Sequence, residues 1–264
     1  MIIYKTEAEI QAIKMSNRIV AKVLAGLWPL IKPGVRTKEL DDYAEKRARE
    51  MGAIPAFKGY RGYPSALCTS INEEIVHGIP SSRALREGDI ISLDFGVLYE
   101  GYYGDAAVTY PVGKVSERAQ ELILTAEEAF YKGLEQMQEG NRLSDISNAV
   151  QKHVESHGFS VIRNFVGHGI GHSLHEEPQL PNFGNPGCGP KLRPGLVLAI
   201  EPMIAAGDWN VQILDDGWTA VTRDGSLAAH FEHTVALTQR GPEILSLTDE
   251  EEIKTPYLKE NHYA

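Results

Sequence analysis

Two short stretches, Leu85-Arg86-Glu87-Gly88 and Leu192-Arg193-Pro194-Gly195, decide the fold, because each leads into an apolar strand that ends in an acidic residue. The first strand ends at Asp94 and the second at Glu201, so the stretches match at an offset of 107 residues. A second match, at an offset of 106, aligns residues 34–52 with residues 140–158. Two matches at nearly one offset indicate an internal duplication. We therefore predict two pseudo-symmetric halves, over about 1–113 and 114–247, followed by a short polar C-terminal tail.

Each predicted half contains helices followed by sheet. Thr6-Glu7-Ala8-Glu9 is a capping box for a helix that runs until Pro29, and Thr37 is the expected N-cap of a helix that ends at Gly52. Helical spacing returns over 116–138 and 143–157, while β-rich runs fill the remainder of each half. The prediction is a single α+β domain over residues 1–264, in which the two sheets form one continuous layer with helices outside.

Composition narrows the classes of function. The chain has 26 basic and 36 acidic side chains and a formal net charge of −10, which disfavours stable binding to nucleic acid or anionic membrane. The first residues lack a signal-peptide core, and no apolar run approaches the ~20 residues of a membrane span, so a cytoplasmic location is expected. Cys68 and Cys188 are too few and too far apart to form a disulfide framework, and both are predicted to be free thiols.

Four carboxylates and one imidazole are the strongest candidates for chemistry. A hairpin could place Asp94 and Asp105 on one face, although most Asp residues near glycines are turn or cap residues. Glu201 lies at the end of an apolar run and Glu232 precedes another, and an unpaired carboxylate is costly in such places. His168 has a glycine on either side, which leaves its ring unobstructed; the alternative is a core histidine with satisfied hydrogen bonds.

Convergence of these four carboxylates would require cations. Each pair about 4 Å apart repels by about 4 kcal/mol at an effective dielectric of 20, so the cluster would not stay ionised alone. Two divalent ions would replace that repulsion with coordination. Four carboxylates and one imidazole suit manganese, iron, cobalt or zinc, and differ from a thiolate-rich structural zinc site. Two divalent metal ions are therefore the predicted cofactors.

The motifs around these residues closely resemble those of the type I methionine aminopeptidases, over nearly the whole chain. They are Gly167-His168-Gly169-Ile170-Gly171, His175-Glu176-Glu177-Pro178, Ile200-Glu201-Pro202-Met203 and Phe231-Glu232-His233-Thr234. The resemblance implies that family's "pita-bread" fold with a continuous antiparallel sheet. It also implies five metal ligands: Asp94, Asp105, His168, Glu201 and Glu232. Of these, Asp105 and Glu232 would bridge the ions.

The resemblance further implies a hydrolase that removes the initiator methionine from nascent polypeptides when the second residue is small. Water activated by the ions would attack, Glu201 would carry the proton, His175 would stabilise the oxyanion and His77 would hold the scissile amide. The implied pocket for the methionine side chain consists of Tyr60, Tyr63, Cys68, Leu174 and Trp218. The N-terminal peptide of a nascent chain is the expected partner, the ribosome is a further candidate, and a monomer is expected.

Two other functions stay open at this point. One is a proline-specific aminopeptidase of the same fold, and the other is a metal-free module of that fold that binds peptides, histones or RNA. The chain also departs from the family in three places: Leu174 stands where many relatives have Phe, Ala228 replaces Ser, and His230 replaces Gln. Ala228 weakens the case for a monovalent-cation site, and His230 could change the surroundings of Glu232. The Gly- and Pro-rich stretch 184–190 is predicted to be a loop without an assigned function.

Overall fold

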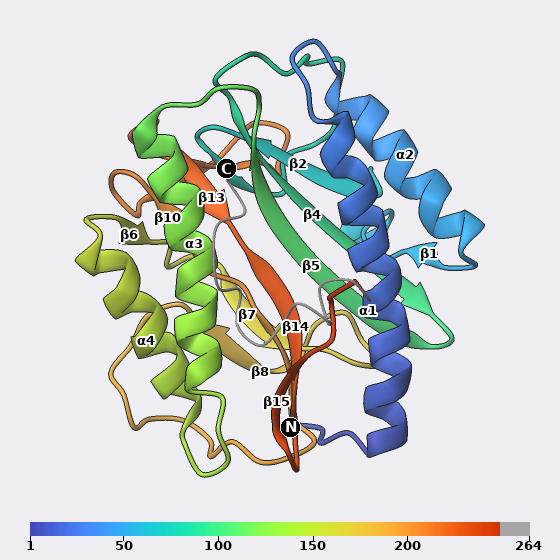
Figure 1. Cartoon of the computed structure of the whole chain (residues 1–264), viewed down its shortest axis with the longest axis vertical. Helices are drawn as coiled ribbons and strands as arrows, with labels where there is room; N and C mark the ends of the chain where they lie inside the picture. Colours follow the sequence, from blue (N-terminus) through green and yellow to red (C-terminus); the bar gives the residue numbers. More distant parts are fainter. Residues whose placement is uncertain (249–264) are drawn as a thin grey trace.

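The computed structural model describes residues 1–248, so the expected polar tail lies, from residue 249 on, outside the described residues. Helices and strands alternate in the predicted order (Figure 1). The described elements are α1 (Glu7–Leu27), η1 (Trp28–Leu30), α2 (Thr37–Glu50), β1 (Ile54–Pro55), η2 (Tyr60–Gly62), β2 (Leu67–Ile71), β3 (Glu74–Val76), β4 (Ile90–Tyr99), β5 (Tyr102–Pro111), α3 (Glu117–Glu135), α4 (Leu143–Ser156), β6 (Ser160–Val161), β7 (Val166–Gly169), β8 (Glu176–Pro181), β9 (Val197–Ile200), β10 (Met203–Ala205), β11 (Val211–Ile213), β12 (Ala220–Thr222), β13 (Ala228–His230), β14 (Glu232–Thr238) and β15 (Gly241–Ile244).

The helix starts follow local hydrogen bonding. The capping box at the start of α1 is confirmed, because the Thr6 N–H donates to Glu9 Oε2 over 2.7 Å and the Thr6 hydroxyl accepts from the Glu9 N–H. The prediction that Thr37 is the N-cap of α2 is wrong: Thr37 is the first helical residue and Arg36 is the cap. The buried Thr37 hydroxyl instead accepts from the Ser81 N–H over 2.8 Å, which joins the helix to the loop before β4.

Two helix ends also differ slightly from the predictions. The C-cap of α2 is Met51, and Gly52 follows it with a φ of 78°. The third helix, α3, ends at Glu135 and does not reach residue 138. Met137 is fully buried just beyond that end, so the chain turns inward where the prediction continued the helix.

The two predicted halves share equivalent backbone contacts as well as matching sequence. In each half, the residue before the second helix forms an isolated antiparallel bridge with a residue of a later loop. A glycine just before that residue donates its N–H to a leucine carbonyl of the same loop. These pairs are Arg36 with Ala84 and Gly34 with Leu85 in the first half, and Arg142 with Lys191 and Gly140 with Leu192 in the second. The stretch 184–190 occupies the position in the second half that the loop before β4 occupies in the first. Ser144, at the start of α4, donates both its N–H and its hydroxyl to the Cys188 carbonyl of this stretch.

The two halves share one nine-stranded sheet in the order β1-β4-β5-β14-β9-β7-β8, with β2 beside β4 and β15 beside β14. Every pairing within it is antiparallel, and the halves meet where Glu232 of β14 lies opposite Ala107 of β5. The predicted continuous antiparallel sheet is therefore confirmed. Figure 1 shows the pairs α1–α2 and α3–α4 at opposite sides of the central strands.

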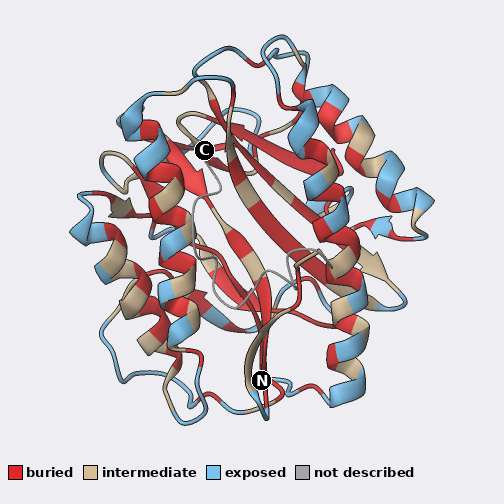
Figure 2. Ribbon diagram, viewed as in Figure 1, coloured by how far each residue is buried: buried red, intermediate tan, exposed pale blue. Residues whose placement is uncertain are grey.

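The core lies between the sheet and these helices. In Figure 2 the central strands are almost entirely buried, while each helix has an exposed outer face. One cluster of buried side chains joins α1 and α2 to the first-half strands, and two others join α3 and α4 to the second-half strands. Apolar burial of this kind is the main driving force for the fold. No helix within residues 1–248 combines the length and apolar character needed to cross a membrane.

One strand prediction needs correction, because β4 does not end at Asp94. It continues to Tyr99, with Phe95 and Val97 fully buried, and turns through Glu100 and Gly101 at positive φ into β5. A two-residue turn with both φ angles positive matches the twist of a tight hairpin. Asp94 therefore lies in the middle of a long hairpin, where its backbone is held by strands on either side.

Gly104 in β5 is the point at which α1 comes closest to this hairpin. A Cβ there would lie 2.7 Å from the Asn17 backbone nitrogen, so Gly104→Ala must move the helix or the strand. We expect the variant to lose about 1–3 kcal/mol of unfolding free energy, as overpacked sites do. Denaturant unfolding measures this loss, and Gln11→Ala on the exposed face of α1 is the control, expected within about 0.5 kcal/mol of the parent. An unchanged stability for Gly104→Ala would contradict the close contact.

Candidate active site

A cavity of about 310 Å³ brings the predicted site residues together. All twelve of them line it, and they come from both halves: Tyr60, Tyr63, Cys68, His77, Asp94, Asp105, His168, Leu174, His175, Glu201, Trp218 and Glu232. The volume suits one amino-acid side chain and an adjacent peptide bond. The structure thus places these residues around one space, while their individual roles remain predictions.

The strand register explains why the four carboxylates meet. Asp94 lies opposite Ala107, which in turn lies opposite Glu232, so β4, β5 and β14 contribute a row across the sheet. Asp105 lies opposite Gly96, two residues from Asp94, and side chains two residues apart point to the same face. Glu201 directly follows Ile200, which pairs with the residue after Glu232. Hydrogen bonding of the backbone therefore determines this convergence.

These carboxylates lie in an environment that opposes their ionisation. Burial raises the pKa of Asp94 to about 7. The pKa values of Asp105, Glu201 and Glu232 are raised well above their usual range, first by burial and then by the negative charge of neighbouring carboxylates. Asp94 Oδ1, Asp105 Oδ1 and Glu232 Oε1 are buried without a hydrogen-bond partner within residues 1–248. Unpartnered buried oxygens around one point fit a divalent cation, which would satisfy them and restore their ionised forms.

His168 supplies nitrogen to the same face. It lies on β7 opposite Ala199, and its Nε2 is 3.5 Å from Glu201 Oε1. Its Nδ1 is 2.9 Å from the Gly169 carbonyl, so Nδ1 carries the proton and Nε2 keeps a free lone pair. Burial lowers the pKa of His168 to about 4, which keeps the ring neutral. A neutral ring with its other nitrogen bonded to a carbonyl is the usual state of a metal-binding histidine.

His175 has different partners, although its ring packs against His168 with centroids 4.3 Å apart. Its Nδ1 lies 2.8 Å from the Tyr60 hydroxyl. When the tyrosine donates this bond, Nε2 remains as the ring's N–H donor. Burial lowers the pKa of His175 to about 3, with His168 contributing a smaller effect. The turn that carries His175 is held by Glu176, whose carboxylate accepts from Lys5 Nζ over 2.6 Å.

His77 and the aromatic residues form the wall beside the carboxylates. His77 has a φ of 63°, a left-handed conformation that is costly for a residue with a Cβ and is often found at functional sites. Its ring meets Phe165 and Trp218 edge-on, with centroids 5.4 and 6.3 Å away. Tyr63 also meets Trp218 edge-on, and the Tyr63 hydroxyl donates to the Gly78 carbonyl over 2.9 Å. These contacts fix an apolar wall next to His77.

Cys68 and Leu174 complete the apolar part of the cavity. Cys68 lies opposite Asp94 in the β2–β4 pairing and is buried, while Cys188 is exposed; both are free, as predicted. Burial raises the pKa of the Cys68 thiol, so it is a neutral, weakly polar group. Leu174 is 2% exposed and packs with Cys68 and Tyr63 in one cluster.

The cavity has further lining residues that sequence reasoning missed: Phe57, Arg61, Val76, Asn164, Phe165, Val166 and Met203. Met203 and Val76 adjoin motifs that the sequence singled out, and proximity along the chain could have indicated them. Phe165 has no such signal, because its contact with His77 joins the two halves of the chain.

His230 is also enclosed beside the carboxylates. It is 1% exposed, and burial lowers its pKa to about 3. Its Nε2 lies 3.7 Å from Glu232 Oε2 and 3.8 Å from Glu201 Oε2. From the sequence it appeared only as a departure from the family pattern.

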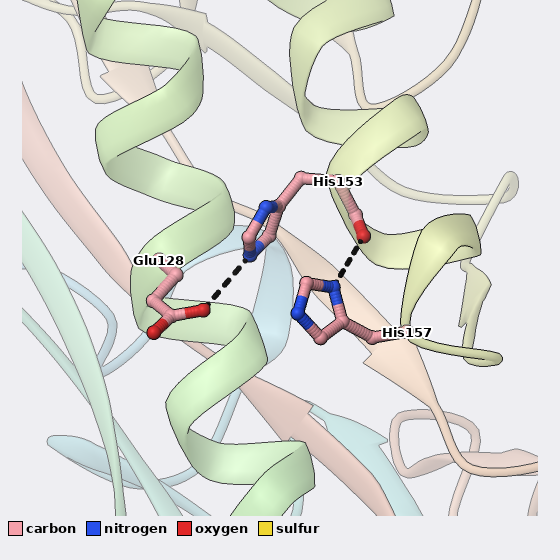
Figure 3. Close-up of side chains that lie close together, drawn as sticks. All are labelled: Glu128, His153 and His157. Atoms are coloured by element: carbon pink, nitrogen blue, oxygen red, sulfur yellow. Dashed lines mark hydrogen bonds and ion pairs between the residues drawn. The ribbon is translucent and has the colours of Figure 1, made fainter.

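A second group of possible metal ligands lies far from this cavity, between α3 and α4 (Figure 3). There His153 Nε2 is 3.0 Å from Glu128 Oε2, and His157 Nδ1 is 2.8 Å from the His153 carbonyl. Glu128 and His157 are exposed. These nitrogens already have hydrogen-bond partners, unlike the buried oxygens of the cavity, and the group needs no ion to satisfy it.

Metal removal should make stability depend on pH in a defined direction. The folded, metal-free protein holds a proton on Asp94 up to a pKa of about 7, whereas the unfolded chain releases it near 3.8. The folded state therefore binds more protons in this window, and its stability falls as pH rises through it. We expect chelated protein to melt at a lower temperature at about pH 7.5 than at about pH 5.5.

Calorimetric melting of the chelated protein measures this dependence, with Asp94→Asn as the matched control. The Asn side chain cannot ionise, so the control should show a weaker rise in melting temperature on acidification. A parent and a control with the same pH dependence would contradict the raised pKa of Asp94.

Comparison with known proteins places this chain in a family. A model of metallopeptidase family M24 matches residues 11–239. Methionine aminopeptidase 1 of Bacillus subtilis is 53% identical over 246 residues, which cover 93% of this chain and 99% of the relative; that of Clostridium perfringens is 52% identical over 247 residues, covering 94% and 99%. The crystal structure of methionine aminopeptidase from Thermotoga maritima superposes with a TM-score of 0.92 at 48% identity, covering 94% of this chain and 100% of that one.

A more distant structure shares the fold alone. Prolidase from Pyrococcus furiosus superposes with a TM-score of 0.77 at 24% identity and covers 94% of this chain and 66% of the prolidase. The much higher identity to the methionine aminopeptidases separates the two groups. The chain belongs to metallopeptidase family M24 and, within it, to the methionine aminopeptidases.

Proposed function

We propose that this protein removes the N-terminal methionine from nascent polypeptides whose second residue is small, using two divalent metal ions. One observation carries the proposal: four carboxylates, three of which have a buried oxygen without a partner within residues 1–248, lie with a neutral histidine around a cavity whose other wall is apolar. Membership of family M24 makes a divalent metal cofactor part of the enzyme. The donor set suits manganese, iron, cobalt or zinc.

Five side chains would hold the ions, four of them carboxylates and one an imidazole. The full set is Asp94, Asp105, His168, Glu201 and Glu232. When bound, divalent ions neutralise the carboxylates, polarise the scissile carbonyl and lower the pKa of water. The substrate's free α-amine is a further donor for this centre, which would restrict cleavage to the first peptide bond.

Protons and the developing charge are assigned to three side chains of the chain itself. Glu201 would take a proton from the attacking water on a carboxylate oxygen and return it to the leaving amine. His175 would donate its Nε2–H to the oxyanion, with Tyr60 holding the ring through Nδ1. His77 would hold the scissile amide, since Phe165 and Trp218 fix the position of its ring. Neutral histidines suit these tasks because they donate without adding charge to the site.

The apolar wall would accept the methionine side chain. Tyr60, Tyr63, Cys68, Leu174 and Trp218 present rings, a thiol and an alkyl group, which suit a flexible thioether. Leu174 is smaller than the Phe common in relatives and leaves more room in this slot. Because the substrate is a newly made chain, we place the enzyme in the cytoplasm, with the ribosome as a candidate docking partner. We further propose that the enzyme is a monomer.

The first test varies only the peptide. We expect Met-Ala-Ser to be cleaved, and Met-Arg-Ser to be cleaved with a kcat/KM lower by about tenfold or more, because space beside His77 limits the second side chain. An Xaa-Pro peptide with a first residue other than Met separates the rival function of a proline-specific aminopeptidase. Equal rates for Ala and Arg at the second position would exclude the proposed selectivity, and preferred cleavage of the Xaa-Pro peptide would favour the rival.

The second test separates His168 from His175. His168→Ala removes a nitrogen whose lone pair faces the carboxylates, so metal affinity should fall with the rate, and added metal should restore part of it. His175→Ala should bind metal normally and lose about 2.7–4 kcal/mol in kcat, as for a single oxyanion donor. Calorimetric metal titration with steady-state kinetics measures both effects. If His175→Ala loses metal as severely as His168→Ala, or keeps its full kcat, the assignment of roles is wrong.

A further inference from the structure

His230 is a buried polar side chain whose ring has no hydrogen-bond partner. Its Nδ1 and Nε2 both lack one within residues 1–248, and the residue is 1% exposed. The two nearest carboxylates, those of Glu201 and Glu232, lie 3.8 and 3.7 Å from Nε2, which is too far for a hydrogen bond. Buried polar groups are almost always satisfied, and Nε2 is the ring nitrogen that lies near the two carboxylates, so a partner shared with them would satisfy it.

The position of the ring follows from a rigid backbone. The His230 N–H donates to the Thr109 hydroxyl over 2.9 Å, and that hydroxyl donates to the His230 carbonyl over 2.8 Å. On the other side, His230 pairs with Met203 in the β10–β13 ladder. A residue held from both sides, and followed two positions later by Glu232, presents its side chain to the carboxylates in a fixed way.

The spacing matches that of a histidine already assigned to the metal centre. Donors bound to one ion at about 2.0–2.2 Å lie roughly 3–3.5 Å from each other. His168 Nε2 is 3.5 Å from Glu201 Oε1, and His230 Nε2 is 3.8 Å from Glu201 Oε2, so the two rings flank one carboxylate at nearly the same separation. A shift of about 0.3 Å would bring His230 Nε2 into the same range of separation from Glu201 Oε2.

We propose that His230 is a sixth protein ligand of the metal centre and binds, through Nε2, an ion that Glu201 and Glu232 also hold. This inference rests on the proposed function. The donor atoms of the cavity form two groups, each within 4.8 Å: Asp105, His168 and Glu232 in one, and Glu201, His230 and Glu232 in the other. The two groups share Glu232, and each contains one imidazole.

A second imidazole changes the metal preference of the centre. An amide at this position, as in the family pattern, offers oxygen, whereas imidazole favours zinc, cobalt and iron over manganese. The ion beside His230 should therefore discriminate more strongly against manganese than the corresponding ion in a His230→Gln variant. This chain-specific effect does not depend on catalysis.

Cobalt(II) bound to the full-length protein is the probe for the test. X-ray absorption at two equivalents of cobalt counts imidazole ligands, and calorimetric titration measures each binding event. All proteins carry His153→Ala and His157→Ala, which remove the exposed group in Figure 3 as a competing site. We expect two imidazoles per two cobalt ions in the parent, one in His230→Gln, and a loss of about tenfold or more in the affinity of one binding event only.

The results of these measurements distinguish failure of the inference from failure of the proposed function. One imidazole per two ions in the parent, or an unchanged titration in His230→Gln, would overturn the inference. The imidazole count in the parent can be made even if the His230 variants do not fold. A His230→Gln that binds like the parent, with only His230→Ala impaired, would assign the ring to a hydrogen bond with a carboxylate and would also overturn it. If the parent binds two ions, shows one imidazole ligand and still cleaves Met-Ala-Ser, the inference about His230 fails while the proposed function stands. A parent that binds no cobalt and cleaves no peptide removes the proposed function itself.

Discussion

Mutual repulsion among Asp94, Asp105, Glu201 and Glu232 is the constraint on which the rest of this structure depends. Each pair about 4 Å apart repels by about 4 kcal/mol at an effective dielectric of 20, and burial adds to the cost of ionising them. Without a cation, the site can relieve this repulsion only by holding protons: burial raises the pKa of Asp94 to about 7, and burial together with neighbouring carboxylates raises the pKa values of Asp105, Glu201 and Glu232. A divalent metal centre resolves the same repulsion and makes it useful, because the carboxylates then bind the ion and do not oppose one another.

The duplicated architecture holds these groups together against their repulsion. Each half contributes a helix pair packed on its own strands, and the halves join through antiparallel pairing of β5 with β14. That seam passes directly beneath the carboxylates, since Ala107 of β5 lies between Asp94 and Glu232. The acids are therefore carried by the most interior strands, where local motion is most restricted.

His168, His175 and His230 differ in the hydrogen-bond partner of each ring and not in charge. His168 is bonded to a backbone carbonyl, His175 to the Tyr60 hydroxyl, and His230 to no residue within 1–248. Burial keeps all three neutral. In a neutral imidazole the hydrogen bond at one nitrogen decides what the other can do, so these partners leave a free lone pair on His168 Nε2 and an N–H on His175 Nε2.

The sequence alone determined the matching stretches of the two predicted halves and the helix-and-sheet order, and it singled out the four acids and His168 that line one cavity. These features depend on local spacing, capping and the cost of placing a carboxylate in an apolar run. The sequence misplaced Asp94 at a strand end and Thr37 at a cap, since strand length and hydroxyl partners are decided by distant residues such as Ser81. Only the tertiary structure decided the contact of Phe165 with His77 and the enclosure of His230. Those features arise where segments far apart in the chain pack together, and no local pattern encodes that packing.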